Sequence, residues 1–542
     1  INDNINELTN QVILPAEFNY PLACSIELIT NDQQIDLSSF VIKYGDNTTG
    51  AGNVIIPLIA NTDEHKRKIE VSFEMTDLDL MPIIGIIKEQ LKKYDNNQTS
   101  YTPYYDFDLI ADIKAVKANL NNQPVRNFNL SADLINDVFT IKNMSGLLSG
   151  DTDVSINGDI YESEEVLTYN FNVKAISQDF LKFLEQINIT PKTYAQATYR
   201  NASANFTVSG NLNKINITPL NFTLDKTNIF GNMGIIRDAR NGLLINLDAD
   251  NINFDNYIPA LTAEEKELPL NEKIKVILNK LAFLNKVDIE ADLKLGIGIY
   301  SGSSFEKSAV KFTSDQNIVK IENLNIENIN DALFNLSGEI SDIANIPHFK
   351  NVKYFFKTSK MEKFMKKISF KIPAIRFMED TQNVNMKGII TGDISNINIK
   401  AITSLDKLSS VYSGRLYGVD NQLNYKGNLE FRSPDFVDFV NRLGYNYKPQ
   451  NVTANIFTFK GDVEGNYNRW NAKNIDAFIG SNNFKGEISV VNDGYPQVTA
   501  TLHANKFEFD RFIYNPESLS VRQVKKTKTI DTAINFLKQP TF

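Results

Sequence analysis

The chain has 542 residues, which argues against a single compact domain unless the architecture is elongated and repetitive. Its formal net charge of −9 leaves no global basic field to attract nucleic acid, so we predict no nucleic-acid partner. One Cys and three His argue against a disulfide scaffold and a Cys/His zinc site, and we predict neither a metal nor another cofactor.

Alternation of apolar and polar residues is the clearest local signal. It recurs in FNLSADL from Phe128, YNFNVKA from Tyr169, FTVSGNL from Phe206 and IEADLKLGIGI from Ile289. A strict period of two predicts antiparallel strands with one dry face and one wet face, and the wet face takes charged residues such as Glu290. The residues that we predict to line the dry face are Phe128, Leu130, Phe171, Val173, Phe206, Val208, Ile289, Leu293, Leu295 and Ile297.

Helical patterns are few and short. The sequence predicts helices at 80–93, 179–187, 263–284 and 435–443. An acidic residue recurs before short apolar segments, at Asp79, Asp179, Asp255, Asp435 and Asp510. A carboxylate in that position accepts hydrogen bonds from the free N–H groups of a first helical turn, so we predict caps rather than catalytic acids.

A period of about 180 residues underlies this pattern. The segment VSGNLNKINI around Gly210 matches ITGDISNINI around Gly392 (392 − 210 = 182), and Asp255 precedes Asp435 by 180 residues (435 − 255 = 180). Each period holds two related β-rich halves, so we predict an elongated repeat protein in which Gly210 superposes on Gly392 and Asp255 on Asp435. The predicted segments are 1–100, 101–190, 191–284, 285–370, 371–445 and 446–542, the last with a basic C-terminal run.

Catalytic motifs are absent from the sequence. The HExxH, Walker A, GxSxG and CxxC patterns do not occur, so we predict that the protein is not an enzyme. Cys24 lies between apolar residues in PLACSIEL, and we predict a small buried side chain there.

A sheet with one apolar face must bury that face against something. Because helices are few, two arrangements remain open: a sandwich that the sheet fills by itself, or a trough in which a ligand supplies the second layer. A dry trough would suit acyl chains, since each buried CH₂ contributes roughly 0.8 kcal/mol. The predicted fold is therefore mainly β, an elongated repetitive antiparallel sheet that forms a groove or sandwich-like trough with a few short capping helices.

Two segments of the chain, 206–259 and 287–340, resemble the AsmA-like family of bacterial envelope proteins, and the resemblance extends from about 35 to 512. It rests on strand alternation, a Gly before a strand and an Asp before an apolar helix. The resemblance implies a long periplasmic body with a hydrophobic β-groove, held at the inner membrane by an N-terminal helix. It also implies a role in outer-membrane homeostasis and in phospholipid movement between the two membranes.

The sequence contains no run of about 18 apolar residues, and it begins at Ile1. We therefore expect a segment of a longer chain whose membrane anchor lies upstream. The predicted function is a non-enzymatic periplasmic groove protein that binds or conducts phospholipid acyl chains between the inner and outer membranes, with envelope proteins as further partners. The alternative is a secreted or surface-exposed β-rich adhesin that binds through its exterior.

Overall fold

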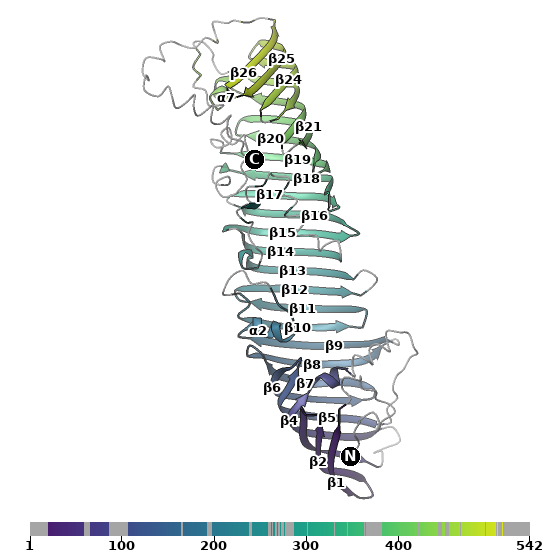
Figure 1. Ribbon diagram of the computed structural model, residues 1–542. Helices are drawn as coiled ribbons and strands as arrows, with labels where there is room; N and C mark the ends of the chain where they lie inside the picture. The colour runs from purple at the N-terminus through teal and green to yellow at the C-terminus, as the bar shows by residue number, and fades with distance from the viewer. Residues whose placement is uncertain are drawn as a thin grey trace, which may run out of the picture. The chain divides into compact units, whose positions relative to one another are not determined.

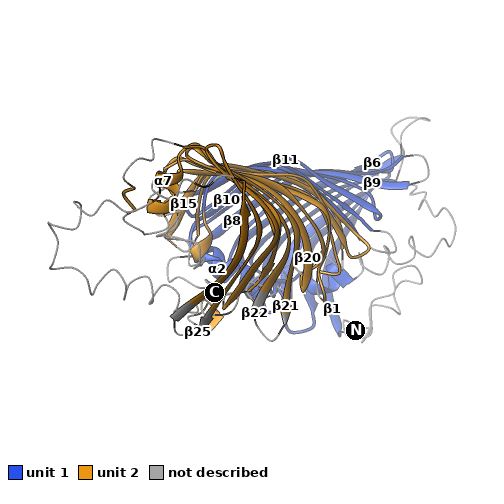
Figure 2. Cartoon of the chain, turned by 90° about the horizontal axis from the view of Figure 1, so that it is seen from above, with its two compact units in different colours: residues 1–252, 256–258 blue, residues 253–255, 259–542 orange. Residues whose placement is uncertain are grey.

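The structure is a computed structural model, and strands dominate it (Figure 1). It forms two compact units (Figure 2): unit 1 comprises residues 1–252 and 256–258, and unit 2 comprises 253–255 and 259–542. The residues that the structure describes are 20–58, 66–85, 107–163, 166–191, 198–237, 241–257, 262, 264–265, 268, 272, 276, 287–300, 302–329, 331–343, 345–361, 364, 382–419, 422–442, 447–449, 455–466, 468–493, 495–505, 507 and 512.

Thirteen strands make up the described part of unit 1. They are β1 (Leu22–Thr30), β2 (Gln34–Tyr44), β3 (Thr48–Pro57), β4 (Arg67–Asp79), β5 (Phe107–Leu120), β6 (Gln123–Ile135), β7 (Val138–Leu148), β8 (Thr152–Ser163), β9 (Val166–Ser177), β10 (Ala202–Gly210), β11 (Lys214–Leu224), β12 (Thr227–Ile236) and β13 (Gly242–Asn253). Strands next to each other in sequence pair with each other from β1 to β13, so unit 1 is one continuous sheet.

The described part of unit 2 repeats this plan with thirteen strands of its own. They are β14 (Asp288–Tyr300), β15 (Ser303–Asp315), β16 (Ile318–Ile329), β17 (Ala332–Ser341), β18 (His348–Thr358), β19 (Val384–Asp393), β20 (Asn396–Leu405), β21 (Leu408–Val419), β22 (Gln422–Ser433), β23 (Phe457–Gly465), β24 (Arg469–Ile479), β25 (Asn482–Asp493) and β26 (Tyr495–Ala504). All twelve neighbouring pairs are antiparallel.

The prediction of an elongated, mainly β fold is confirmed. Strands lie about 4.8 Å apart, so twelve consecutive pairings extend each sheet by roughly 58 Å across its strands. One feature differs from the prediction: β4 and β5 run parallel, which makes the sheet of unit 1 mixed. A parallel pair needs a crossover of about a dozen residues or more, and residues 80–106 separate these two strands. The boundary between the two compact units falls within the predicted segment 191–284. The division of the chain into six repeat segments stays a prediction.

Helices are short in the part of the chain that the structure describes: α2 (Phe180–Gln186), η3 (Phe254–Asn256), α7 (Phe436–Arg442) and a helical turn at 81–85. The predicted helices at 179–187 and 435–443 are thus confirmed. The predicted helices at 80–93 and 263–284 lie mostly outside the described residues.

The predicted acidic caps are confirmed at two positions and wrong at a third. The Oδ1 atom of Asp435 accepts hydrogen bonds from the N–H groups of Val437 (2.9 Å) and Asp438 (3.3 Å) in α7. Asp79 accepts from the N–H of Met81 at 3.0 Å. Asp179 precedes α2 but makes no side-chain cap bond, because its carboxylate forms ion pairs with Lys182 and Arg200.

Asp255 lies within the first turn of η3 rather than before it. Instead of capping η3, it accepts a hydrogen bond from the N–H of Gly302, which opens the hairpin between β14 and β15, at 3.0 Å. Asp510 lies outside the described residues.

The 180-residue period recurs in the backbone. Asn127 and Lys307 (307 − 127 = 180) both have positive φ, 51° and 47°. The register between β6 and β7 shifts between residues 126 and 129 and again between 131 and 132. The register between β15 and β16 shifts at 306–309 and 311–312, the same positions plus 180. Equivalent sequences in the two units therefore build equivalent local irregularities.

Gly158 and Gly338, also 180 residues apart, show why one repeated glycine is needed. Their φ angles are +148° and +144°, a region that favours glycine. A Cβ at Gly158 would lie 2.7 Å from Cα of Phe171, and one at Gly338 would lie 2.5 Å from Cα of Val352. Both contacts are with backbone of the next strand, which cannot move aside without breaking the pairing.

We expect Gly158→Ala and Gly338→Ala to lower the free energy of unfolding by about 1–3 kcal/mol each, because both combine a strained φ with a backbone collision. The midpoint of urea unfolding, followed by far-UV circular dichroism, measures the effect. Gly242→Ala is the matched control: a Cβ there meets Ile236 at an ordinary 3.5 Å, and the midpoint should change little. Equal midpoints for all three variants would contradict the assigned register.

Candidate functional site

One side of the sheet in unit 1 is apolar from strand to strand. Residues directly opposite each other on paired strands point to the same side. Val173 of β9 lies opposite Phe206 of β10, and Phe171 lies opposite Val208. The pairings on either side extend this row through Ile156, Ile217, Met233 and Ile245. The four residues predicted for this region therefore lie side by side.

The row continues toward the N-terminal strands of the same unit. Leu130 of β6 lies opposite Ile113 of β5 and opposite Met144 of β7, and Met144 in turn lies opposite Ile156 of β8. Phe128, two residues before Leu130, is buried on the same side. We call this side the unit 1 face; it brings together all six dry-face residues predicted in this unit.

Unit 2 carries an equivalent apolar side, the unit 2 face. Leu293 of β14 lies opposite Val310 of β15, and the row continues through Leu324, Leu336 and Tyr354. Ile289 and Leu295 also lie on this side, the first buried and the second partly buried. Three of the four dry-face residues predicted in unit 2 thus lie together.

Ile297 is the exception, since it lies opposite Glu306 and 48% of its side chain is exposed. The positive φ of Lys307 interrupts the alternation of β15 at this point. The next pair along the two strands is Gly298 and Phe305. The ring of Phe305 lies over the buried Gly298, so this pair makes the apolar contact that we predicted for Ile297. The same switch occurs one period earlier, where Ala118 and Val125 are buried opposite each other.

The apolar faces are open over long stretches. In the described part of β8–β13, Ala202 is the one apolar side chain that is buried; Phe171, Val173, Phe206 and Val208 are partly exposed. A sandwich packs its inner faces about 10 Å apart at the density of an organic crystal, which buries such side chains fully. The unit 1 face therefore resembles a trough more than the core of a filled sandwich.

Buried clusters occur at limited places along the faces. In unit 1, Leu78, Ala118 and Val125 belong to a cluster that includes Phe128. In unit 2, Val463, Ala472, Ile475 and Ala477 form another, against which Phe457 and Phe459 pack.

The helices cover the margins of these faces. The rings of Phe180 in α2 and Phe222 in β11 are 6.1 Å apart. Phe439 in α7 contacts Phe431 and Phe457, with ring distances of 4.8 Å and 5.1 Å. The short helices thus lie on the apolar side of the sheet, where they shelter a few strands each.

Three tyrosine hydroxyls are among the polar groups of the unit 2 face. Burial raises the pKa of Tyr425 to about 12, and burial also raises the pKa of Tyr354 and Tyr412. All three rings therefore stay neutral at physiological pH and add no charge to the face.

The opposite side of each sheet is polar and solvated. In unit 1, Asn172 receives a hydrogen bond from Thr207 (2.8 Å) and donates one to Asn157 (3.1 Å). In unit 2, Lys311 and Glu322 pair at 2.8 Å, and their hydrogen bond raises the pKa of the lysine and lowers that of the glutamate. Exposed pairs of this kind add little stability, but they keep this side wet.

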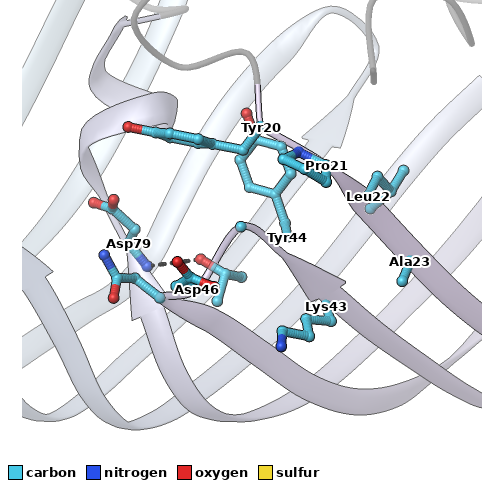
Figure 3. Close-up of a pocket in the computed structure, with 11 residues that line it drawn as sticks. Tyr20, Pro21, Leu22, Ala23, Lys43, Tyr44, Asp46 and Asp79 are labelled. Carbon is cyan, nitrogen blue, oxygen red and sulfur yellow. Dashed lines mark hydrogen bonds between the residues drawn. The ribbon is translucent and has the colours of Figure 1, made fainter. Parts of the chain in front are cut away.

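A hollow of about 420 Å³, lined by both apolar and polar residues, lies at the start of unit 1 (Figure 3). The rings of Tyr20 and Tyr44 meet edge to face at 5.7 Å, and Asp46 and Asp79 lie beside them. The N–H of Asp79 donates to Oγ1 of Thr48 at 3.0 Å. The lining residues that the structure describes include neither His nor Cys, and the described residues contain no group of His, Cys, Asp or Glu that would hold a metal ion.

A second hollow, of about 460 Å³, lies on the unit 2 face beside α7. We call it the α7 cavity. Its lining consists of Phe436, Val440, Tyr447, Phe457, Phe459, Ile475, Ala477, Ile479, Phe484, Ile488, Leu502, Phe507 and Phe512. Sequence reasoning missed it, because its residues come from α7, four strands and three positions outside these elements, and a period of two describes one strand at a time.

No protein-family model matches the chain, and no curated protein or solved structure matches it either. The resemblance to AsmA-like proteins therefore stays a prediction. No helix in the described part of the chain is both long and apolar enough to span a membrane.

The prediction that Cys24 is buried is wrong. Its side chain is exposed, because β1 has a single strand partner among the described residues and lies at the edge of the sheet. An edge strand has neighbours on one side only, so apolar flanking residues in the sequence do not ensure burial.

The openness of the unit 1 face is testable by thiol labelling in a Cys24→Ser background, which removes the native thiol. We expect Val173→Cys to react with a small maleimide at least about tenfold faster than Ala202→Cys, because Val173 is partly exposed and Ala202 is 7% exposed. Lys174→Cys, on the polar side, sets the rate of an exposed thiol. Equal protection of Val173→Cys and Ala202→Cys would show that a second layer covers the face.

Proposed function

We propose that the protein binds phospholipid acyl chains along its apolar faces and moves them between the two membranes of a bacterial envelope, without catalysing a reaction. The observation that carries this proposal is the open apolar row in each unit, from Ile113 through Val173 to Ile245 in unit 1 and from Leu293 to Tyr354 in unit 2. An uncovered apolar surface of this length marks a binding surface for something apolar.

The energetics favour a chain-like ligand. Each methylene removed from water contributes roughly 0.8 kcal/mol, so a chain of about 15 methylenes gains roughly 12 kcal/mol if fully buried and about half of that on an open face. Part of this gain is offset by the lost freedom of the chain. The remainder suits reversible binding, as a transfer protein needs.

The open side of the trough also accommodates the rest of a phospholipid. Burying a charged headgroup without partners would cost several kcal/mol or more. On an open face the headgroup stays in water while the acyl chains lie on the sheet. Because apolar residues repeat from strand to strand, about 4.8 Å apart, a chain crosses no polar barrier as it shifts along one unit.

The resemblance to AsmA-like proteins supports the cellular setting of the proposal. In that setting the protein is periplasmic, is anchored to the inner membrane by a segment upstream of this chain, works with envelope protein partners and supports outer-membrane homeostasis.

A second candidate is a secreted or surface adhesin that binds through the polar side. Two exposed aromatic rings favour it: Phe230 is 50% exposed and Phe478 is 41% exposed, and their strand partners include Asp248 and Thr458. They lie in different units, and single exposed aromatic residues are common on protein surfaces. The continuous apolar faces therefore make acyl-chain binding the leading proposal.

Photo-crosslinking tests the proposal. A photo-reactive residue in place of Phe171, in the full chain expressed in a bacterial envelope, should crosslink to phospholipid. Adding Val208→Asp, directly opposite, should reduce the yield about tenfold or more, because the carboxylate interrupts the dry row. An open face hydrates the new carboxylate, so the unfolding midpoint should change little, whereas a filled core would lose several kcal/mol.

Thr207→Asp is the matched control, since it places the same charge one residue away on the polar side. It should leave the lipid crosslink in place. If the chain with the photo-reactive residue at position 171 and no other substitution yields no lipid crosslink, acyl-chain binding is contradicted and the adhesin becomes the leading proposal. Unfolding of Val208→Asp alone would show that the face is a packed core.

A further inference from the structure

Aromatic rings form an arch over the α7 cavity. From β23 to β25, the successive ring pairs are Phe457–Phe436 (5.4 Å), Phe436–Phe512 (6.3 Å), Phe512–Phe507 (5.2 Å) and Phe507–Phe484 (5.4 Å). The floor between them is β24, which contributes Ile475, Ala477 and Ile479. The strand and the rings thus bound the cavity on more than one side, while Leu502 and Phe507, 43% and 44% exposed, leave it open to solvent.

A hydrogen bond holds Phe512, one of the aromatic residues of the arch, in place. The hydroxyl of Tyr447 donates to the backbone oxygen of Phe512 at 2.9 Å, and burial raises the pKa of this tyrosine. The hydroxyl therefore remains a donor at physiological pH and holds Phe512 beside Phe436. It is also engaged within the protein, so it is not aimed at a ligand.

The apolar lining of the cavity favours an apolar ligand. The lining residues that the structure describes are all aliphatic or aromatic, and among them the one side-chain polar atom is the Tyr447 hydroxyl. An ordered water needs two to four polar partners, so water is poorly held here. Protein interiors leave few empty spaces larger than one water molecule, and about 460 Å³ falls in the usual range of ligand sites. An apolar ligand fits this space best.

We propose that the α7 cavity is a holding site for one unbranched acyl chain, which passes beneath the aromatic arch while its headgroup stays outside. At roughly 30 Å³ for each methylene, close to the volume of a liquid water molecule, the cavity takes about 15 methylenes. Phe459 of the lining lies opposite Phe431 on β22, so the cavity continues the unit 2 face. This inference rests on the proposed function, and it adds a discrete site where the aromatic rings shelter one chain.

Leu502→Trp fills the cavity without disturbing a packed core, because Leu502 is 43% exposed on β26. Val498→Trp is the matched control: Val498 lies on the same strand and the same side, is 65% exposed and does not line the cavity. The probe is a sixteen-carbon fatty acid with a mid-chain diazirine. A parallel arm uses phosphatidylethanolamine vesicles with the same acyl chain, which separates free fatty acid from phospholipid as the source.

After irradiation of the full chain, peptide mass spectrometry should place crosslinks on β24, β25 and α7. Leu502→Trp should reduce the yield at these sites about tenfold, and Val498→Trp should change it less than about twofold. Unfolding midpoints of both variants should match the wild type. Crosslinks on the strands around Val173 that spare the α7 cavity, or equal effects of the two variants, would overturn the holding site and leave the proposed function standing.

Two further outcomes count against the site. No crosslink anywhere on the chain would overturn both the holding site and the proposed function. A photo-reactive residue in place of Phe484 that links to protein rather than to lipid would show that a segment of protein occupies the cavity.

Discussion

An apolar side left in water costs a sheet free energy, and the way this sheet limits that cost explains most of the structure. In the described part of the chain, α2 and α7 are too short to cover more than a few strands. Aromatic side chains extend their cover, as Phe180 does toward β11 and Phe439 toward β22 and β23. The remaining apolar surface stays partly open, and a ligand that covers it would stabilise the fold as it binds.

The sheet does not depend on a second layer for its backbone hydrogen bonds. Each strand between the outer two of a unit pairs on both sides, and most connections are hairpins between neighbours in sequence. The polar side adds hydrogen-bonded rows such as Asn157, Asn172 and Thr207, which tolerate water. The backbone and the polar side therefore maintain the architecture, while the apolar side is left available for binding.

Periodicity predicted the sides of the strands wherever the alternation runs unbroken, as at Phe171, Val173, Phe206 and Val208. It failed at Ile297, because the positive φ of Lys307 shifts the pattern and lysine gives no sign of that conformation. Asn127, at the equivalent position one period earlier, is a residue type that adopts it readily. Other features depend on contacts distant in sequence and leave no local pattern: the parallel β4–β5 pair and the aromatic arch between residues 436 and 512.

The two kinds of apolar surface would treat a bound chain differently. Under the proposed function, an acyl chain on the open face would lose contact with water on one side only, so it would bind more weakly and leave faster. Under the arch the rings also cover the outer side, more area is buried, and dissociation requires that whole contact to break. Under the proposed function, the cover that α7 and a few phenylalanines provide would therefore turn one end of the unit 2 face into a defined stopping point.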